Sequence, residues 1–267
     1  MGAVQHDRQY RDHVAYWILK VILTPVFYLF WRVEVEGRDN VPARGPVVLA
    51  ANHQSFCDSF FLPLVLRRRV TYVAKAEYFD SWRTSWFFRA AGQIPMQRSG
   101  GDASQRALDT AREVLEAGGV LGIYPEGTRA PDARLHRGHT GVVRLALGCG
   151  VPLVPVGLQG TRRVQPPGRR LMRPFHAVTV RFGPPLDVGT VGAGEAAVAG
   201  HDSAVLRAVT DELMHTIAGL SGQEYVDEYA SRSKRPDPSG GAGGAGGAGG
   251  AGGAGGAGGA GGAGAGS

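Results

Sequence analysis

Cysteine is scarce in this chain, which has only Cys57 and Cys149 among 267 residues. Two cysteines cannot build a disulfide framework, so the chain is not a disulfide-stapled secreted domain, and it fits a reducing, intracellular setting. Cys57 lies in a polar stretch, which makes a cysteine nucleophile one hypothesis. Its neighbour Phe56 favours the alternative, a small buried apolar side chain.

The sequence also lacks the motifs of several enzyme classes. There is no P-loop and no Gly-x-Ser-x-Gly elbow. Four histidines of the second half, His136, His139, His176 and His215, do not have the spacing of metal ligands. We therefore expect no metal and no resident cofactor.

Acidic residues are nearly absent from the stretch between Arg129 and Arg181, which holds ten arginines and one acid, Asp132. A block of this kind predicts a polyanionic partner, either a phosphate-bearing substrate, anionic lipid headgroups or nucleic acid. A solvated basic face is the alternative. The chain has no recognisable nucleic-acid module, so we expect no nucleic-acid partner.

The end of the chain lacks side chains that could form a core. From Gly240 to Ser267 it is almost pure Gly-Gly-Ala repeat, with 18 of the 42 glycines. We expect a disordered tail over residues 236–267. The remaining residues, about 235, suffice for one α/β domain.

The most apolar run extends from Val14 to Trp31 and is interrupted by Lys20 and Pro25. A straight helix of this length would measure about 27 Å, close to the thickness of a bilayer core. Aromatic and basic residues around it are typical of an interfacial anchor. We expect residues 1–32 to form a membrane-associated helical segment, folded as a hairpin at Pro25. A secretory signal or a buried core helix are the alternatives.

A polar segment follows the apolar run Pro46–Ala50, which predicts a buried strand ending in Asn52-His53. Asp58 lies five residues after His53, so the two side chains can meet only if His53 is in a loop and Asp58 begins the next helix. An imidazole held by a carboxylate is a general base for a hydroxyl. Alternatively, Ser55 is the N-cap and Asp58 simply caps that helix.

A second strand with polar residues at its end covers Val120 to Ile123 and leads into Tyr124-Pro125-Glu126-Gly127-Thr128-Arg129. Arg129 offers a planar fork of donors suited to phosphate, and the amides of Gly127 and Thr128 can approach an anion closely. Glu126 is expected to orient the arginine or the hydroxyls of a substrate. Further strands are expected around residues 33–36, 69–74, 92–98, 151–156 and 176–182, and helices around 104–117, 138–147 and 204–220.

These two motifs resemble those of the glycerolipid acyltransferases of the 1-acylglycerol-3-phosphate O-acyltransferase type. Asn52-His53 with Asp58 resembles the Asn-His-x4-Asp signature, and Glu126 to Arg129 resembles the Glu-Gly-Thr-Arg motif. Gly92 to Arg98 is similar to the second motif, with Gln97 in place of aspartate. Val151 to Val156 is similar to the fourth, and the resemblance spans residues 33–186.

The resemblance implies a single α/β domain over residues 33–235, with a mixed β-sheet flanked by helices. It implies transfer of a fatty acyl chain from acyl-CoA or acyl carrier protein to the hydroxyl of 1-acylglycerol-3-phosphate, giving phosphatidic acid in phospholipid biosynthesis. His53 and Asp58 would be catalytic. The substrate-binding candidates are Lys75, Arg98, Glu126, Gly127, Thr128 and Arg129.

The expected partners are a lysophospholipid acceptor, the thioester donor and the lipid bilayer, on the cytoplasmic face of the cell membrane. The altered Gln97 and the arginine-rich stretch after Thr161 leave open another lysolipid or glycolipid acceptor. A non-catalytic peripheral protein that binds anionic lipid is a further alternative.

Overall fold

The computed structural model describes residues 2–75, 85, 88, 91, 93–96, 103–169, 171–186 and 203–233. The chain divides into two units, Met1–Arg235 and Pro236–Ser267. The second unit lies outside the described residues, and so do Gln97 and Arg98. The domain boundaries expected from the sequence therefore stay predictions.

A seven-stranded sheet in the order β1-β8-β7-β2-β5-β3-β4 forms the centre of the fold. Every neighbouring pair is parallel except β7 and β8, so the sheet is mixed, as predicted. In spatial order the strands are β1 (Arg32–Glu36), β8 (Ala177–Phe182), β7 (Leu153–Gln159), β2 (Val47–Ala51), β5 (Val120–Ile123), β3 (Val70–Lys75) and β4 (Gln93–Met96).

Strand β2 shows why the sequence folds into layers. All five of its residues are buried. Val47 and Leu49 pack in one apolar cluster, whereas Val48 and Ala50 pack in another. Successive strand side chains point to opposite faces, so an uninterrupted apolar run is what a strand covered on both faces requires.

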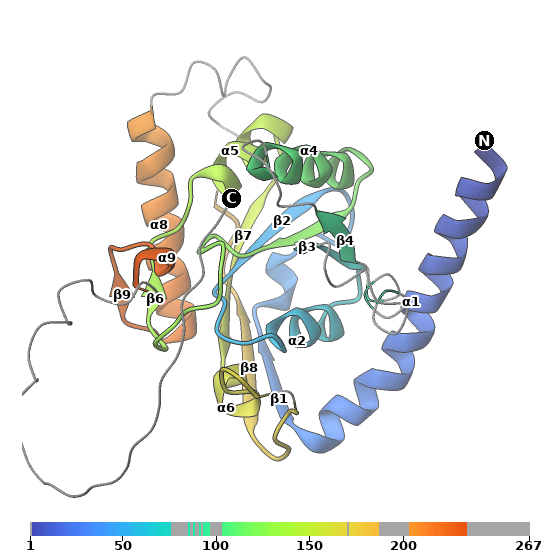
Figure 1. The fold of residues 1–267 in the computed structure, drawn as a ribbon, viewed down its shortest axis with the longest axis horizontal. Helices are drawn as coiled ribbons and strands as arrows, with labels where there is room; N and C mark the ends of the chain where they lie inside the picture. Colours follow the sequence, from blue (N-terminus) through green and yellow to red (C-terminus); the bar gives the residue numbers. More distant parts are fainter. Residues whose placement is uncertain are drawn as a thin grey trace, which may run out of the picture. The chain divides into compact units, whose positions relative to one another are not determined.

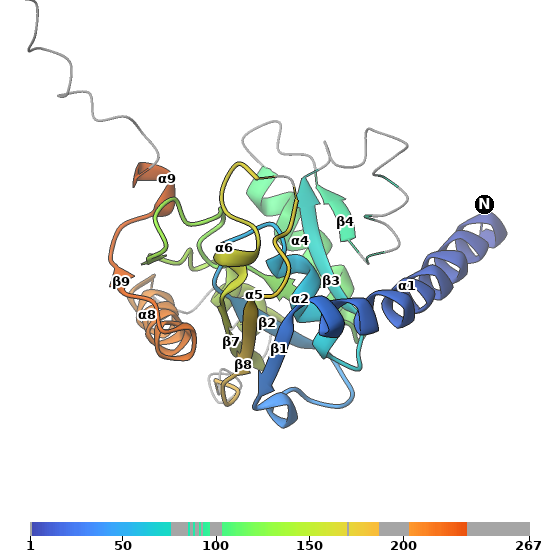
Figure 2. The same cartoon turned by 90° about the horizontal axis from the view of Figure 1, so that it is seen from below.

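Two groups of helices cover the two faces. One cluster packs α4 (Ala103–Glu116), α5 (Gly141–Cys149) and α8 (Ser203–Ser221) against the sheet. The other packs the end of α1 (Gly2–Phe30) and α2 (Asp58–Val65). Figure 2 shows α8 on one side of the strands and α1 on the other. The α/β architecture expected from the sequence is confirmed.

Helix α1 corrects one expectation, because it is a single helix that contains Pro25 and not a hairpin. A proline inside a helix removes one backbone hydrogen bond. The buried side chains of Phe27 and Trp31, packed on Phe61 beyond the proline, hold the last turns in place. Among the described helices, none has both the length and the apolar character needed to cross a bilayer. A membrane role of this segment stays a prediction.

Lys20 lies near the middle of α1 and connects it to α2. Its Nζ donates hydrogen bonds to the carbonyl oxygen of Pro63, at 2.7 Å, and to that of Leu66. These carbonyls belong to the C-terminal end of α2, where backbone acceptors lack partners within the helix. Burial, followed by the charge of Arg38, lowers the pKa of Lys20 to about 8.

Four short elements were not expected from the sequence. They are the helices α6 (Thr161–Val164) and α9 (Ala230–Ser233) and the strands β6 (Leu135–His136) and β9 (Tyr225–Val226), which pair in a separate two-stranded parallel sheet. The chain also forms a 3-10 turn, η1 (Arg38–Asn40), after β1. The small sheet joins the segment after α8 to the loop after β5 (Figure 1). Elements of two to four residues are too short for a periodic pattern.

Candidate active site

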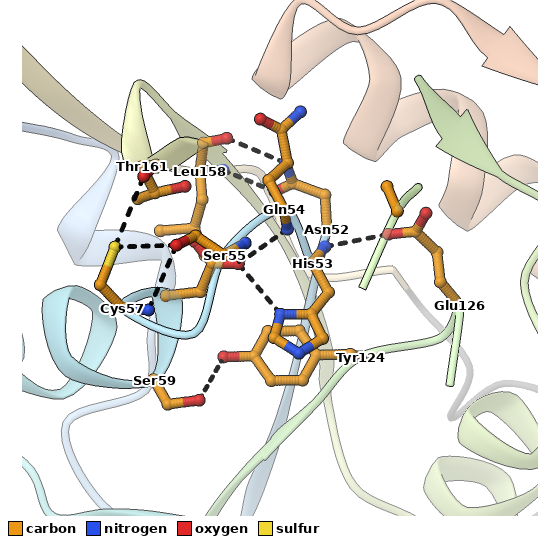
Figure 3. A network of polar contacts seen from close by, with 12 residues as sticks. Asn52, His53, Gln54, Ser55, Cys57, Ser59, Tyr124, Glu126, Leu158 and Thr161 are labelled. Atoms are coloured by element: carbon orange, nitrogen blue, oxygen red, sulfur yellow. Dashed lines mark hydrogen bonds and ion pairs between the residues drawn. The ribbon is translucent and has the colours of Figure 1, made fainter. Parts of the chain in front are cut away.

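The two polar motifs meet because β2 and β5 are parallel neighbours, with Ala50 in register with Ile123. Both strands end at the same edge of the sheet, which is where open α/β folds place their ligands. Figure 3 shows His53, from the segment after β2, beside Tyr124 and Glu126, from the segment after β5. The amide of Ala130 also donates to the carbonyl oxygen of His53, at 2.8 Å.

His53 and Asp58 form the predicted pair, with His53 in the loop and Asp58 as the first residue of α2. The Nδ1 atom of His53 lies 3.0 Å from Oδ2 of Asp58. The Asp58 side chain has no exposed surface, whereas that of His53 is 17% exposed. The ring is therefore anchored to a buried carboxylate and is itself partly exposed.

Asp58 also orders the loop that carries the histidine. Its Oδ2 atom accepts the backbone N–H groups of Gln54 and Ser55, both at 2.8 Å. One carboxylate oxygen thus holds the imidazole and the two residues that follow it. Because loop and ring share this acceptor, the position of the ring is set locally.

Ser55 does not have the capping role expected for it. The residue that precedes α2 is Cys57, and the hydroxyl of Ser55 donates to the carbonyl oxygen of Gln165, at 2.8 Å. Only the reverse half of the capping box is present, since the Asp58 carboxylate reaches back to the Ser55 amide. The sequence pattern assigned the Ser55 hydroxyl to capping α2, but in the structure it binds a backbone carbonyl oxygen from a distant part of the chain.

Cys57 is not suited to act as a nucleophile. Its side chain is fully buried, and its sulfur contacts the hydroxyl of Ser55, at 3.2 Å. Burial, followed by the charge of Asp58, raises the pKa of the thiol to about 12. A thiol with this pKa is not ionised at neutral pH, and only the thiolate is strongly nucleophilic.

Glu126 binds the backbone on both of its oxygens. Oε2 accepts the backbone N–H of His53, at 2.9 Å, and Oε1 accepts that of His136, at 3.0 Å. Burial raises the pKa of this carboxyl group to about 7. A contact of this carboxylate with substrate or arginine, expected from the sequence, stays a prediction. In the structure the carboxylate positions the peptide of His53.

Tyr124 is a site residue that the sequence interpretation missed. Its ring stacks on the imidazole of His53, with centroids 3.8 Å apart and planes 9° from parallel. Its hydroxyl lies 2.9 Å from that of Ser59 on α2 (Figure 3). Burial raises the pKa of Tyr124 well above its ordinary value, so the phenol stays protonated. Tyr124 directly follows β5 at the sheet edge, and this position was the signal from which the sequence could have indicated it.

The remaining substrate-binding candidates lie around this centre to different extents. Gly127 has a positive φ of 69°, and its amide closes a turn onto the carbonyl oxygen of Tyr124, at 2.9 Å. Thr128 is partly buried and Arg129 is exposed, directly before Ala130. Lys75 is the last residue of β3. Arg98 lies outside the described residues.

The segment after α8 also supports the site, which the sequence did not indicate. The Asn52 side chain makes two hydrogen bonds to the backbone of Leu158, at 2.7 and 2.8 Å, and donates to Oε1 of Gln223, at 2.6 Å. Gln223 in turn donates to the carbonyl oxygen of Ala133, at 2.8 Å. Gln223 therefore links the residue before His53 to the loop after β5.

His136 forms a second histidine–aspartate pair, with Nε2 2.9 Å from Oδ1 of Asp132. Its side chain is completely buried, and its Nδ1 lies 3.2 Å from the carbonyl oxygen of Glu228. With both ring nitrogens engaged and no exposed surface, His136 holds β6 against the C-terminal segment. Within the described part of the chain, no three His, Cys, Asp or Glu side chains group as metal ligands.

An apolar groove runs between α1 and α2 and reaches Ser59, the partner of Tyr124. Its walls come mainly from apolar side chains on both helices. The lining residues are Tyr16, Leu19, Lys20, Leu23, Ser59, Phe60, Pro63, Leu64 and Ala91. Through Ser59, one wall of the groove contacts Tyr124, whose ring stacks on His53.

Comparison with known proteins gives a consistent result. The sequence model of the family described as Acyltransferase matches residues 32–159. The Bacillus subtilis 1-acyl-sn-glycerol-3-phosphate acyltransferase is 31% identical over 144 residues, which cover 53% of this chain and 68% of the relative. The chloroplastic enzyme BAT2 of Brassica napus is 30% identical, covering 60% of this chain and 46% of its own.

A solved structure is similar as well. The crystal structure of the 1-acyl-sn-glycerophosphate (LPA) acyltransferase PlsC from Thermotoga maritima aligns with a TM-score of 0.58 and 26% identity. The alignment covers 82% of this chain and 83% of that protein. The chain spans about half the length of the chloroplastic relatives that it matches.

Proposed function

This chain belongs to the acyltransferase family, and we propose that it transfers a fatty acyl group from a thioester to the free hydroxyl of 1-acylglycerol-3-phosphate. The product would be phosphatidic acid, an intermediate of phospholipid biosynthesis. The observation that carries the proposal is the His53–Asp58 pair at the end of β2, anchored by a buried carboxylate and open on the imidazole side.

The imidazole would act as a general base towards the acceptor. Because Nδ1 of His53 is bonded to Asp58, Nε2 is the atom that remains to take the hydroxyl proton. The acceptor oxygen then attacks the thioester carbonyl carbon and forms a tetrahedral oxyanion. When this collapses, the C–S bond breaks, and the imidazolium returns its proton to the leaving thiolate. The negative charge of Asp58 stabilises the imidazolium between the two steps.

Arg129 is the candidate for the acceptor phosphate. It is exposed and lies one residue before Ala130, whose amide binds the carbonyl oxygen of His53. Its guanidinium can bind a phosphate through two parallel hydrogen bonds. The arginine-rich stretch after Thr161 is equally compatible with 1-acylglycerol-3-phosphate and with another anionic lysolipid. The identity of the acceptor is therefore part of what we propose.

The apolar groove between α1 and α2 is suited to the acyl chain. Ser59 is one of its lining residues and contacts Tyr124, which stacks on the imidazole of His53. Apolar walls bind an alkyl chain through the hydrophobic effect, which is worth roughly 0.8 kcal/mol per buried CH₂. The donor would be acyl-CoA or acyl carrier protein, and no further cofactor is invoked.

We propose that α1 lies on a membrane. Exposed apolar side chains are frequent along it; they are Val14, Ile18, Val21, Ile22, Val26, Leu29 and Phe30. A helix that exposes this much apolar surface is suited to the interface of a bilayer. The enzyme would then be a peripheral or monotopic protein on the cytoplasmic face of the cell membrane.

The test is thiol release from a long-chain acyl-CoA, with and without lysophosphatidic acid, for the wild type, His53→Ala and His176→Ala. We expect acceptor-dependent release in the wild type and in the His176→Ala control, and its loss in His53→Ala. An acceptor panel with lyso-aminolipids and glycolipids tests specificity. Acceptor-dependent release that persists in a folded His53→Ala protein would contradict the catalytic role of His53.

A further inference from the structure

The segment between α6 and β8 presents two large apolar side chains to solvent. Leu171 is 84% exposed and Phe175 is 70% exposed. Neither belongs to α1, and neither is part of the site around His53. Single exposed apolar residues are common on protein surfaces, so their surroundings decide whether they have a function.

Phe175 adopts a backbone conformation that a bulky residue rarely takes. Its φ is 65°, in the left-handed region, and besides Phe175 only Ala133 among the described non-glycine residues has a positive φ. Such a conformation is costly for a bulky side chain and persists only where the surroundings impose it. A strained residue that directs an aromatic ring into solvent is not explained by packing.

The end of α1 imposes this conformation. The amide of Phe175 donates to the carbonyl oxygen of Phe30, at 2.6 Å, and Nε1 of Trp31 donates to the carbonyl oxygen of Arg173, at 2.7 Å. The ring of Phe175 lies 6.2 Å from that of Phe30, between centroids. The segment before β8 is thus fixed to the C-terminal end of α1 (Figure 1).

This connection extends an apolar surface. Val26, Leu29 and Phe30 are all exposed and occupy helix positions three and four residues apart, so they share one side of α1. Phe175 contacts Phe30 from the neighbouring segment. We call Leu29, Phe30 and Phe175, together with the exposed Leu171 four residues before Phe175 in the chain, the apolar edge.

Positive charge accompanies the apolar edge. Arg163, Arg169 and Arg173 come from the same stretch of chain and are exposed. From Ala133 to Leu186 the sequence has no aspartate or glutamate. Exposed apolar side chains next to arginines, without acids, match the interface of an anionic bilayer, where apolar groups enter the acyl boundary and basic groups bind headgroups.

We propose that residues 163–169 and 171–175, together with the C-terminal end of α1, form a second membrane contact, in which Leu171 and Phe175 enter the interface of an anionic bilayer. This rests on the proposed function only in that an enzyme acting on lipids must reach a lipid surface. A nucleic-acid surface would not require the exposed leucine and phenylalanine, so the bilayer is the partner that the full set of side chains fits.

The experiment measures binding of the full chain to vesicles of phosphatidylcholine, with and without phosphatidylglycerol, by co-sedimentation. The variants are Phe175→Gly, Leu171→Ser and the control Val205→Ser, an exposed apolar residue on α8. We expect about tenfold weaker binding for each of the first two, from the loss of one buried apolar side chain. The control should bind like the wild type.

The melting temperature of Phe175→Gly is a second readout, and it should not fall together with vesicle binding. Glycine adopts a positive φ without steric cost, so the melting temperature should stay the same or rise while vesicle binding falls. A residue kept for packing would show a lower melting temperature. The double variant Arg169→Gln/Arg173→Gln should reduce the preference for vesicles with phosphatidylglycerol and leave binding to neutral vesicles unchanged.

Three results would overturn the proposal: wild-type protein that does not bind anionic vesicles, binding that is unchanged in Phe175→Gly and Leu171→Ser, or a wild-type dimer that these variants dissociate without a loss of vesicle binding. Because binding is measured without turnover, it is independent of the thiol-release assay. Binding that depends on Phe175 in a protein without acyl transfer would support the contact and contradict the proposed function.

Discussion

The imidazole of His53 lies flat against the ring of Tyr124, with centroids 3.8 Å apart and planes 9° from parallel. Asp58 holds the same imidazole in its plane through Nδ1, and Glu126 holds the backbone N–H behind it. His53, the candidate catalytic residue, is therefore held at one face of its ring, at the Nδ1 edge of the ring and at its backbone N–H. None of these three contacts involves Nε2, the atom proposed to take the hydroxyl proton.

Replacing Tyr124 tests the importance of the stacked face. In Tyr124→Leu the imidazole loses a planar neighbour and can rotate about its side-chain bonds, so we expect kcat to fall about tenfold while KM for the donor changes little. Tyr124→Phe keeps the ring and loses the hydroxyl that contacts Ser59, so it should remain close to the wild type. Equal losses in the two variants would assign the effect to the hydroxyl.

The raised pKa of Glu126 predicts that the free energy of unfolding depends on pH. Burial raises its pKa in the folded state from 4.5 to about 7. Between these values the folded chain keeps a proton that the unfolded chain has released, so the free energy of unfolding decreases as pH rises through this window and levels off above it. Urea unfolding at a series of pH values should show this decrease in the wild type.

Glu126→Gln isolates the effect, because glutamine does not titrate. The difference in unfolding free energy between the wild type and Glu126→Gln should change between about pH 4.5 and 7 and be constant outside that range. A constant difference across the whole range would show that the buried carboxyl group is not the cause. The variant should also lose activity, because one of its two backbone partners, His53 or His136, would face an amide donor.

Gln223 tests whether the segment after α8 supports the site. Gln223→Met keeps the side-chain length and removes the hydrogen bonds to Asn52 and Ala133, which should lower the free energy of unfolding by about 2 kcal/mol, at roughly 1 kcal/mol per bond. Hydrogen exchange of the backbone around His53 should become faster, and kcat should fall more than KM rises.

Gln105→Met is the matched control for Gln223→Met. The amide of Gln105 bonds to Asp109 on the exposed side of α4, within its own helix. We expect no change of activity and no faster exchange around His53. If both variants behave alike, the contacts of Gln223 do not support the site.

Arg129 tests the proposed phosphate contact. In Arg129→Ala, KM for lysophosphatidic acid should rise between about tenfold and a hundredfold, since hydrogen bonds to charged groups contribute roughly 1.5–3 kcal/mol. KM for acyl-CoA should stay the same. Arg134→Ala is the control, because Arg134 pairs with Asp132 on the exposed loop. A similar rise in both variants would point to the general positive charge of the surface.

The motif residues could be predicted because their signals are local. A strand apolar on both faces, with Asn52-His53 directly behind it, indicates a polar group at a sheet edge without any knowledge of the partners. The spacing from His53 to Asp58 likewise requires a loop followed by a helix start, and the structure has this arrangement. The continuity of α1 through Pro25 was predicted wrongly, because its buried contacts lie on distant segments.

The sequence by itself determined the order and kind of the main strands and helices, the two polar motifs and the family to which they belong. Only the tertiary structure decided that Glu126 binds the amide of His53, 73 residues away, and that Gln223 binds Asn52, 171 residues away. The physical reason is that periodicity and turn chemistry act between near neighbours in the chain. Hydrogen-bond partners from distant segments are chosen only when the sheet order and the helix packing bring them within reach.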